Sequence, residues 1–180
     1  MNKIQMSKFL SYVLRHKPDS IGIVLDKAGW IDIDELIEKS IADGKALDRL
    51  LLYDIVAEDN KQRYAISEDG KRIRANQGHS VEVDLELKAA IPPVKLFHGT
   101  YVEAVDTILK QGLKKMKRHH VHLSADPETA GKVGSRRGKA VVLEINTKDM
   151  VKRGIKFFIT ANGVWLTDFV DPEFISVPTT

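Results

Sequence analysis

Side chains that bind anions or exchange protons are concentrated in three short stretches of the sequence. They are RIRANQGHS at residues 72–80, HGT at 98–100 and RHHVHLS at 118–124. An arginine can hold a phosphate or a carboxylate through two parallel hydrogen bonds, and a histidine changes its charge near neutral pH. These stretches are therefore the first candidates for a functional site.

The last of the three stretches is expected to lead into a strand. Alternation along a strand puts His120, His122 and Ser124 on one face and the apolar Val121 and Leu123 on the other. Polar groups in line are costly to bury without partners, so the apolar face is expected to point into the core. The face with the histidines is then expected to line a cleft or to meet solvent.

The tripeptide HGT is expected to follow a short apolar strand and to precede a helix. Gly99 would let a ligand approach the backbone, while His98 and Thr100 would offer a ring nitrogen and a hydroxyl group. Taken alone, a simple turn explains this tripeptide better.

The modest net charge of +3 hides a local concentration of positive charge. Residues 110–139 contain nine lysines or arginines and only two carboxylates, a net charge of +7, so the rest of the chain is acidic overall. A basic surface beside an acidic remainder suits an anionic ligand or a nucleic-acid backbone. A solvated lysine face is the alternative.

Several classes of protein are excluded or disfavoured by what the sequence lacks. The absence of cysteine excludes disulfides, a thiolate nucleophile and cysteine-bound zinc, and no HExxH or similar spacing predicts another metal site. No apolar run reaches the about 18 residues that span a bilayer, and the N-terminal segment lacks a signal-peptide pattern. We expect a cytoplasmic protein with no metal and no membrane contact, and nothing in the pattern requires more than a monomer.

The first part of the chain is expected to be helical. A helix capped by Ser7 would end at His16, because Pro18 forbids its continuation. Arg15 and His16 then lie at a helix C-terminus, where cations complement the helix dipole.

Two more helices and a β-ribbon are expected to complete an N-terminal domain. Helical periodicity predicts helices over 32–41, with Asp32 or Asp34 as cap, and over 46–59. Two short extended segments follow, with a turn at 69–70 between them. This order is typical of a winged helix, which we assign to residues 1–90.

A second domain, expected over residues 91–180, contains mostly strands. VEVDLELK at 81–88 alternates like an extended segment, and AAIPP at 89–93 is the best candidate for a linker. Beyond it the pattern predicts one strand, one helix ending at Gly112 and several strands, with a hairpin turn at Asn162-Gly163. The fold class is therefore expected to be α+β.

Eight segments of the sequence, in this order, resemble successive motifs of the RNA 2′-phosphotransferase family. They are SKFLSYVLRHKP, GWIDIDEL, KQRYAI, IRANQGHS, FHGT, MKRHHVHLS, GSRRGKAVVLEI and FFITANGVWLT. The resemblance covers residues from about 7 to 168. IRANQGHS is much more specific than HGT, and the ordered set is more specific still.

The resemblance implies an NAD-dependent enzyme that removes the internal 2′-phosphate left at a tRNA splice junction. In that family the phosphate attacks the nicotinamide ribose and expels nicotinamide, which gives an RNA-2′-phospho-ADP-ribose intermediate. A ribose hydroxyl then attacks the phosphorus and leaves 2′-OH RNA and ADP-ribose 1″,2″-cyclic phosphate. The family combines an N-terminal winged helix with a C-terminal ADP-ribosyltransferase-like domain.

The resemblance also implies roles for individual residues. Residues that match the catalytic positions are Arg15, His16, Arg63 and Arg136, with Arg137 as the neighbour that could take the place of Arg136. Residues that match the NAD-binding positions are His98, Gly99, Thr100, His120, His122, Ser124 and Val164. Residues implied to bind the RNA are Arg74, Asn76, Gln77, Gly78, His79, Ser80 and Arg118.

The residue types suit this chemistry. A 2′-phosphate carries close to two negative charges, so it attacks without a general base. Val164 stands where protein-modifying relatives of the same fold commonly have a glutamate, which would repel the phosphate. Arginines can instead hold the phosphate and neutralise the charge that develops on it.

Two other functions remain open at the level of sequence. One is an ADP-ribosyltransferase that acts on another phosphorylated nucleic-acid acceptor, such as a terminal phosphate. The other is a winged-helix nucleic-acid-binding regulator that senses a nucleotide. The second leaves His98, His122 and the arginines without a joint role.

Overall fold

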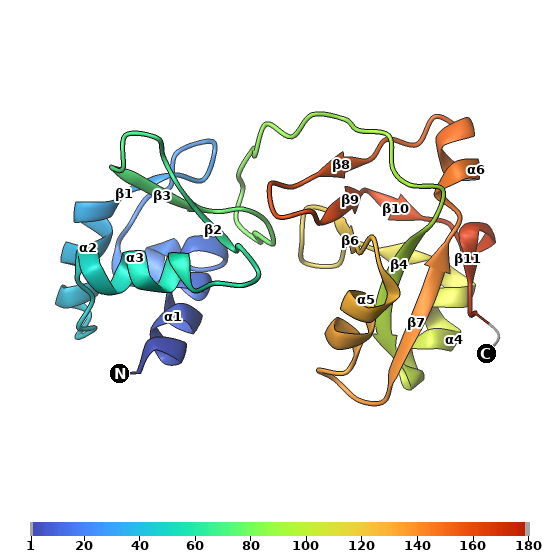
Figure 1. The fold of residues 1–180 in the computed structure, drawn as a ribbon, viewed down its shortest axis with the longest axis horizontal. Coiled ribbons are helices and arrows are strands. Elements are labelled where there is room, and N and C mark those ends of the chain that lie inside the picture. Colours follow the sequence, from blue (N-terminus) through green and yellow to red (C-terminus); the bar gives the residue numbers. More distant parts are fainter. Residues whose placement is uncertain (1, 179–180) are drawn as a thin grey trace. The chain divides into compact units, whose positions relative to one another are not determined.

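A computed structural model describes residues 2–178, and the chain divides into two compact units, residues 1–86 and 87–180 (Figure 1). Both units combine helices with small antiparallel sheets, which confirms the α+β class. Each unit has its own cluster of buried apolar residues.

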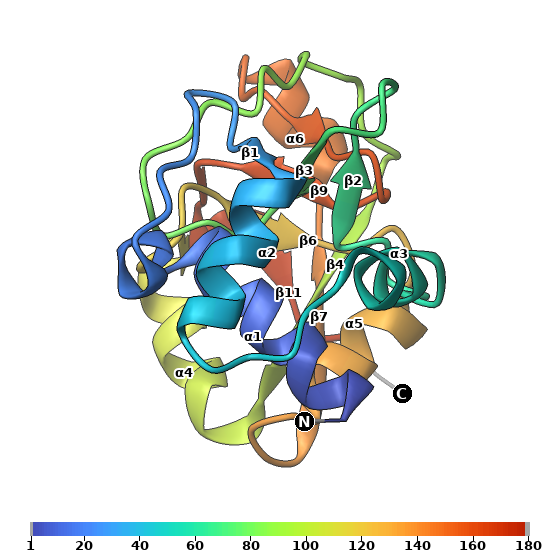
Figure 2. The same ribbon diagram turned by 90° about the vertical axis from the view of Figure 1, so that its left-hand side faces the viewer.

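The first unit packs its helices against a three-stranded sheet (Figure 2). Leu10, Leu36, Leu52 and Ile73 meet in its core with almost no exposure. Its elements are α1 (Lys3–Arg15), η1 (Pro18–Ile21), β1 (Ile31–Asp32), α2 (Ile33–Ala42), α3 (Arg49–Ala57), β2 (Tyr64–Ile66) and β3 (Arg72–Ala75).

Helix α1 begins earlier than the sequence pattern predicts. Asn2 is its N-cap, and Asn2 and Gln5 exchange hydrogen bonds between side chain and backbone in a capping box. Ser7, the predicted cap, lies inside the helix, where its carbonyl accepts a hydrogen bond of 2.8 Å from the Tyr64 hydroxyl. The prediction was wrong because the capping box lies upstream of the first apolar repeat.

The three strands of the first unit pair in the order β1-β3-β2, all antiparallel. The predicted ribbon is confirmed, with its turn around Gly70 and with Ala65 paired to Arg74. Strand β1 was not predicted, because two residues are too few to show alternation. Asp32 caps α2 by accepting hydrogen bonds from Asp34 and Glu35 N–H, as predicted.

Residues 81–88 form no strand, although they alternate in hydrophobicity. The Asp84 side chain accepts a hydrogen bond of 2.8 Å from Glu86 N–H, and Glu86 has a positive φ of 53°. This local turn competes with an extended ladder. The only pairing nearby, within the described residues, is an isolated bridge between Ala89 and Phe158.

The second unit is built around two three-stranded sheets, β11-β7-β4 and β6-β9-β8, and a β10-β5 pair. The figures show α4 and α5 on opposite sides of β4 and β7 (Figures 1 and 2). The elements are β4 (Leu96–Tyr101), α4 (Val102–Gln111), β5 (Leu113–Lys114), β6 (Val121–Leu123), α5 (Pro127–Gly134), β7 (Ala140–Ile145), α6 (Thr147–Lys152), β8 (Phe158–Ile159), β9 (Trp165–Thr167), β10 (Phe169–Val170), η2 (Pro172–Phe174) and β11 (Ile175–Ser176).

A pair of backbone hydrogen bonds joins the two larger sheets. Phe97 and Ser124 exchange N–H···O bonds of 2.9 and 2.8 Å, directly beside His98 and His122. The hairpin predicted at Asn162-Gly163 is also present: it joins β8 to β9, and Gly163 has a φ of 76°. The segment VWLTDFV is two strands, because β10 leaves β9 to pair with β5.

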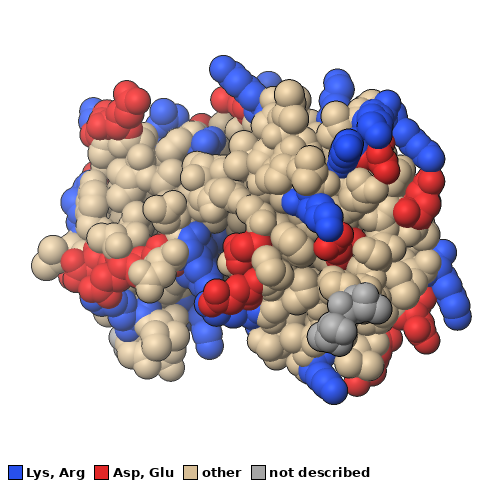
Figure 3. Space-filling model, turned by 45° about the vertical axis from the view of Figure 1, so that its right-hand side comes forward, with Lys and Arg blue, Asp and Glu red and all other residues tan. Residues whose placement is uncertain are grey.

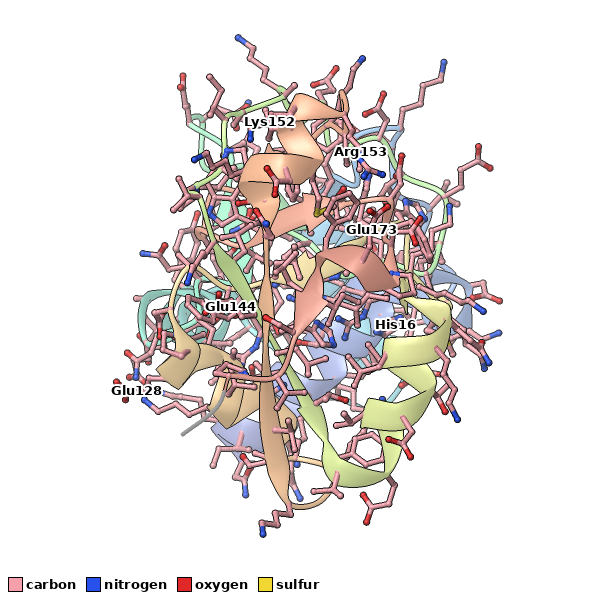
Figure 4. The ribbon with its side chains drawn as sticks, turned by 90° about the vertical axis from the view of Figure 1, so that its right-hand side faces the viewer. His16, Glu128, Glu144, Lys152, Arg153 and Glu173 are labelled. Atoms are coloured by element: carbon pink, nitrogen blue, oxygen red, sulfur yellow. The ribbon has the colours of Figure 1, made fainter. Side chains whose placement is uncertain are left out.

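An ion pair links η2, near the end of the second unit, to the residue that follows α6. Arg153 donates two hydrogen bonds, of 2.6 and 2.8 Å, to the carboxylate of Glu173, and the two side chains point toward each other (Figure 4). The Arg153 guanidinium also lies 5.1 Å from the centre of the Phe174 ring. Both charged groups are exposed, so this contact orders η2 more than it stabilises the fold.

No helix among the described residues is long and apolar enough to cross a membrane.

Candidate active site

Helix α1 ends where two candidate residues follow each other. Arg15 is its last residue, and His16 leaves helical geometry with φ −127° and ψ −38°. The change of backbone direction removes the constraint that neighbouring helical side chains point about 100° apart. The pair can therefore contact a common group.

The RIRANQGHS stretch wraps around this helix end. The N–H of Ser80 donates a hydrogen bond of 2.8 Å to the carbonyl of Arg15, and the Ser80 hydroxyl shares one of 2.9 Å with Nδ1 of His16. Gly78 has a φ of 86°, and a Cβ there would lie 3.6 Å from Nη1 of Arg15. The stretch thus holds the Arg15 and His16 side chains from one side.

Arg63 is fixed by a carboxylate four residues earlier. Asp59, whose side chain is only 4% exposed, forms an ion pair with the Arg63 guanidinium and accepts a hydrogen bond of 2.6 Å from Arg63 N–H. The guanidinium itself is 31% exposed, so it remains accessible to a ligand. We did not predict a role for Asp59, although its i, i+4 spacing to Arg63 is a readable signal.

Asn76 fixes the backbone on the other side of Arg63. Its N–H donates a hydrogen bond of 2.8 Å to the carbonyl of Arg63, and its side-chain amide donates one of 2.6 Å to Gln62. Gln62 has a φ of 44°, a left-handed conformation that needs such support. Asn76 is almost fully buried, so in this structure it supports Arg63 from behind.

Arg74 lies over the ring of Trp30, a residue for which no role was predicted. Its guanidinium is 4.6 Å from the centre of the Trp30 ring, and it donates a hydrogen bond of 3.4 Å to the carbonyl of Ala28. His79 is also buried, and a Cβ on Gly29 would lie 3.4 Å from its Nε2. Gln77 is partly exposed. The polar stretch is therefore partly a packing element of the first unit.

In the second unit, His98 and His122 come together across β4 and β6. Nδ1 of His98 lies 3.1 Å from the carbonyl oxygen of His122, and Nδ1 of His122 lies 3.1 Å from that of His120. A carbonyl only accepts hydrogen bonds, so both Nδ1 atoms carry the proton. In the neutral His98 ring Nε2 is then an acceptor, which suits a hydroxyl group of a sugar.

Burial lowers the pKa of His98, and the positive charge of Arg118 lowers it further, against the opposing effect of the hydrogen bond to His122. His98 is therefore neutral at physiological pH. Val121 and Leu123 are buried while His120, His122 and Ser124 are partly exposed, which confirms the predicted alternation along this strand.

Arg118 lies near His98, and Arg136 and Arg137 lie near Arg118. Loss of contact with water lowers the pKa of Arg118, and the positive charges of Arg137 and Arg136 lower it further. Like charges gathered in this way are stabilised when an anion binds between them. Arg136 and Arg137 both follow the C-terminus of α5 and are exposed.

Gly99 is required for helix packing. A Cβ at this position would lie 1.6 Å from the carbonyl oxygen of Ala130 on α5. The space beside Gly99 that we expected to admit a ligand is therefore filled by α5, and its glycine is explained by the contact with the helix. Thr100, the next residue, is buried.

The remaining candidates in the second unit lie on strands or turns. His120 contacts the Phe158 ring at 5.8 Å and lies 3.8 Å from the Asp168 carboxylate. Val164 closes the hairpin between β8 and β9, where its N–H donates a hydrogen bond of 3.0 Å to the Thr160 hydroxyl. The structure thus gives Val164 a structural contact through its backbone.

Charge on the surface is mixed. On the face shown in Figure 3, lysines and arginines are interspersed with aspartates and glutamates. An anion would be recognised there by local groups of arginines more than by overall charge. Within residues 2–178, no group of three or more histidine, aspartate or glutamate residues could hold a metal ion.

The candidates therefore form two sets, each held within its own unit. Arg15, His16, Arg63 and the 72–80 stretch belong to the first, and the histidines with the three arginines to the second. The candidates themselves are positive or neutral hydrogen-bonding groups, and the nearby carboxylates of Asp59 and Asp168 lie against Arg63 and His120. Such groups suit phosphates and ribose hydroxyls, which NAD and RNA present.

Comparison with known proteins supports this interpretation. Residues 1–169 match the family model described as RNA 2′-phosphotransferase, Tpt1 / KptA family. The chain is 51% identical to a probable RNA 2′-phosphotransferase of Fusobacterium nucleatum over 175 residues, which covers 97% of this chain and 98% of the relative. It is 51% identical to one of Burkholderia pseudomallei, covering 96% and 94%, and 52% identical to one of Escherichia coli, covering 96% and 89%.

The matches extend over nearly the whole chain and confirm the resemblance that the ordered motifs indicated. They also decide for an enzyme over a nucleotide-sensing regulator. The chain belongs to the NAD-dependent RNA 2′-phosphotransferases of the Tpt1 / KptA family.

Proposed function

We propose that the first unit acts as a winged helix that holds the 2′-phosphate of the RNA, and that the second unit is an ADP-ribosyltransferase-like domain that holds NAD. The observation that carries the proposal is the support given to Arg15, His16 and Arg63. All three are fastened to residues 76–80, either directly or through neighbouring backbone. Such fixation is typical of groups that must hold an anion in one position.

The first step needs position more than acid–base catalysis. An oxygen of the 2′-phosphate forms a bond to the anomeric carbon of the nicotinamide ribose, and nicotinamide leaves with the electrons of the broken C–N bond. The phosphate is already an anion, so none of the histidines has to remove a proton. Arg15 and Arg63 bind the phosphate, and Asp59 keeps the Arg63 guanidinium in place.

In the second step a ribose hydroxyl attacks the phosphorus, and the bond between phosphorus and the RNA 2′-oxygen breaks. The RNA oxygen gains a proton and becomes the 2′-hydroxyl, while the attacking hydroxyl loses one. Negative charge increases on the phosphate oxygens, and Arg136 or its neighbour Arg137 supplies the neutralising charge. His16 is exposed beside Arg15 and is the candidate that moves the proton.

Neutral His98 suits the ribose groups of NAD. Nε2 of His98 accepts a hydrogen bond from a ribose hydroxyl, and His122 orients the His98 ring through its carbonyl. Arg118 attracts the phosphate charges of NAD or of the RNA. The remaining proposed NAD contacts are made by His120, Ser124 and Val164, which are partly exposed. Gly99 and Thr100 are proposed to contribute only indirectly, because α5 fills the space beside Gly99 and Thr100 is buried.

The residues proposed to act on the RNA differ in exposure. Exposed residues can contact the RNA directly, whereas buried ones can only support their neighbours. Gln77, Gly78 and Ser80 are at least partly exposed and are proposed to touch the RNA, together with Arg74. Asn76 and His79 are buried, so their proposed contribution to RNA binding is indirect.

The test is to incubate the protein with NAD and an RNA oligonucleotide that carries one internal 2′-phosphate. Nicotinamide release and loss of the phosphate from the RNA should both occur and should each require the other substrate. If neither occurs, the proposed function is wrong. Nicotinamide release with a 5′-phosphorylated RNA but not with the internal 2′-phosphate would instead favour a transferase for terminal phosphates.

We further propose that the natural substrate is a spliced or tRNA-like RNA and that the enzyme acts in the cytoplasm as a monomer. NAD is consumed in each turnover, and we propose that no metal takes part. Activity that persists in a chelator and a mass in solution near 20.2 kDa would support the last two statements.

A further inference from the structure

The sheet of the first unit has an outer face that the proposed catalytic roles leave unused. Ile31 and Ile73 pair with each other and point into the core, where both are buried. Alternation puts Arg74, one residue further along β3, on the opposite face, beside its strand partner Ala65. The ring of Trp30 lies over Arg74 on this face.

Next to Trp30 the surface is hollowed. The hollow has a volume of about 450 Å³ and is lined by Trp30, Ile66, Ser67, Glu68, Asp69 and Arg72. A single nucleobase fits into a space of this size. The aromatic part of the wall comes from Trp30, and the polar part from Arg72 and the turn between β2 and β3.

This turn is held in one conformation. The Asp69 carboxylate accepts hydrogen bonds of 2.6 Å from the Ser67 hydroxyl and 3.1 Å from Lys71 N–H. The Ser67 hydroxyl in turn accepts one of 2.9 Å from Arg72 N–H, and the Tyr53 hydroxyl donates one of 2.9 Å to the Gly70 carbonyl. The hollow is therefore preformed, which lowers the entropy lost on binding.

Charge decides between a base and a phosphate as the occupant. Glu68 and Asp69 line the hollow, and Asp26 lies 3.5 Å from the Arg72 guanidinium. Three carboxylates would repel a phosphate. The oxygens of Glu68 and Asp69, which line the hollow, are, however, acceptors for the amino and imino groups at the edge of a base.

Aromatic and guanidinium groups favour the same occupant. The Arg72 guanidinium lies 5.5 Å from the centre of the Trp30 ring, so an indole and a planar cation border the hollow together. Proteins bind unpaired RNA bases by stacking them on aromatic rings and on arginine planes. The family acts on RNA, which brings such bases to this unit.

We propose that the hollow beside Trp30 binds one unpaired nucleobase of the RNA substrate, stacked on Trp30 and next to Arg72. The proposal rests on the RNA 2′-phosphotransferase function. It adds a base-binding subsite to the phosphate contacts, so that the strand around the 2′-phosphate is held at two places.

The experiment uses a single-stranded RNA with one internal 2′-phosphate, in which one nucleotide at a time is replaced by an abasic nucleotide. With the unaltered protein, one abasic position should lower kcat/KM about tenfold, within the range measured for loss of a stacked base. Trp30→Ala should lower kcat/KM for the intact RNA by a similar factor, and the same abasic position should then have no further effect. Trp30→Phe, which keeps an aromatic ring, should lower kcat/KM by a smaller factor than Trp30→Ala.

The matched control compares two neighbouring cations. Arg72→Ala and Lys71→Ala each remove one positive charge from the same turn, but only Arg72 lines the hollow. The losses of kcat/KM caused by Arg72→Ala and by the critical abasic position should likewise not add. Lys71→Ala should lower kcat/KM for all RNAs alike or not at all.

The outcomes are distinct. If the loss caused by Trp30→Ala is the same for the intact RNA and for every abasic RNA, the subsite does not exist and Trp30 acts only by holding Arg74. If the unaltered protein releases no nicotinamide with any of these RNAs, the proposed function fails instead.

A binding measurement covers the case in which Trp30→Ala does not fold. Trp30 and Trp165 are the two tryptophans of the chain, so Trp30 is the sole indole fluorophore in Trp165→Phe. Its emission should be quenched by the intact RNA and not by the RNA with the critical abasic position. Equal quenching by both would overturn the proposal.

Discussion

At the scale of single residues, the proposed phosphate-binding groups depend on neighbours that never touch the RNA. Asp59 is the clearest example, because its buried carboxylate contacts both the guanidinium and the backbone N–H of Arg63. An arginine held in this way keeps its fork in one orientation without losing side-chain entropy on binding.

Asp59→Asn should therefore lower kcat, by about tenfold or more, if Arg63 neutralises charge in the transition state. An amide keeps the shape but pairs with the guanidinium far more weakly. Glu58→Gln removes a negative charge from the adjacent, exposed residue and should leave kcat unchanged. Activity of Asp59→Asn equal to that of Glu58→Gln would show that Asp59 does not position Arg63.

The two arginines that follow α5 can be separated by substitution. Arg136→Ala should lower phosphate removal by about a hundredfold or more, with thermal stability unchanged, because we propose that its charge neutralises the phosphate in the transition state. Arg137→Ala is its matched control and should have a smaller effect. The reverse order, measured as the rate of phosphate loss from the RNA, would move the role to Arg137.

His98 gives a prediction about pH. Its pKa is lowered in the folded protein from the usual 6.5, so below pH 6.5 the unfolded chain binds a proton that the folded protein does not. The free energy of unfolding must fall as the pH falls from 6.5 toward the lower, folded pKa. In His98→Gln, whose amide can still donate to the His122 carbonyl, urea unfolding should show a weaker fall over this range. Identical pH dependence in the two proteins would contradict the role of burial.

At the scale of elements, helix α5 approaches β4 more closely than side chains would allow. A Cβ on Gly99 would lie 1.6 Å from the Ala130 carbonyl oxygen, and one on Gly134 would lie 2.4 Å from that of Thr100. The two glycines face each other across the contact, so backbone packs directly on backbone. This close contact fixes the position of the C-terminal end of α5. Arg136 follows that end by two residues.

Gly99→Ala and Gly134→Ala should each lower the free energy of unfolding by about 3 kcal/mol or more, since the obstacle is backbone and cannot rotate away. Gly131→Ala is the matched control on the same helix, because a Cβ there would meet Val142 at an ordinary 3.6 Å. It should be neutral or stabilising by up to about 1 kcal/mol. Chemical unfolding of the three variants measures both effects, and a harmless Gly99→Ala would contradict the packing described.

Comparison of these elements shows which features are readable from the sequence. The Asp32 cap of α2, the β-ribbon and the polar face of β6 are set by a few neighbouring residues, and local pattern predicts them. The tight packing of Gly99 depends on α5, which comes far later in the chain. Local sequence pattern cannot reveal a contact with a distant helix, so Gly99 was expected to leave space for a ligand instead.

The candidate site was predictable in its residue types and less so in its supports. The resemblance supplies Arg63 and His98, but Asp59 and Trp30 emerge from contacts in the fold. Residues 81–88, expected to be an extended segment, form no strand in the described fold. Hydrophobic alternation fits a half-buried strand, but a strand also needs a neighbouring strand with which to form hydrogen bonds.

At the scale of the whole molecule, the separation into two cores matches the separation of the proposed tasks. Leu10 and Leu36 belong to the core of the first unit, and Leu143 and Met150 to that of the second. Each cluster lies within one unit. Stability of one unit should therefore be adjustable without change in the other.

Each unit carries one tryptophan, Trp30 or Trp165, which makes this testable in the full chain. In Trp165→Phe the emission reports the first unit, and in Trp30→Phe it reports the second. Adding Leu36→Ala, which opens a cavity in the first core, should destabilise the transition seen by Trp30 by about 2–5 kcal/mol. The transition seen by Trp165 should stay within about 0.5 kcal/mol of its original value. Equal shifts of both transitions in urea would show that the two cores unfold as one cooperative unit.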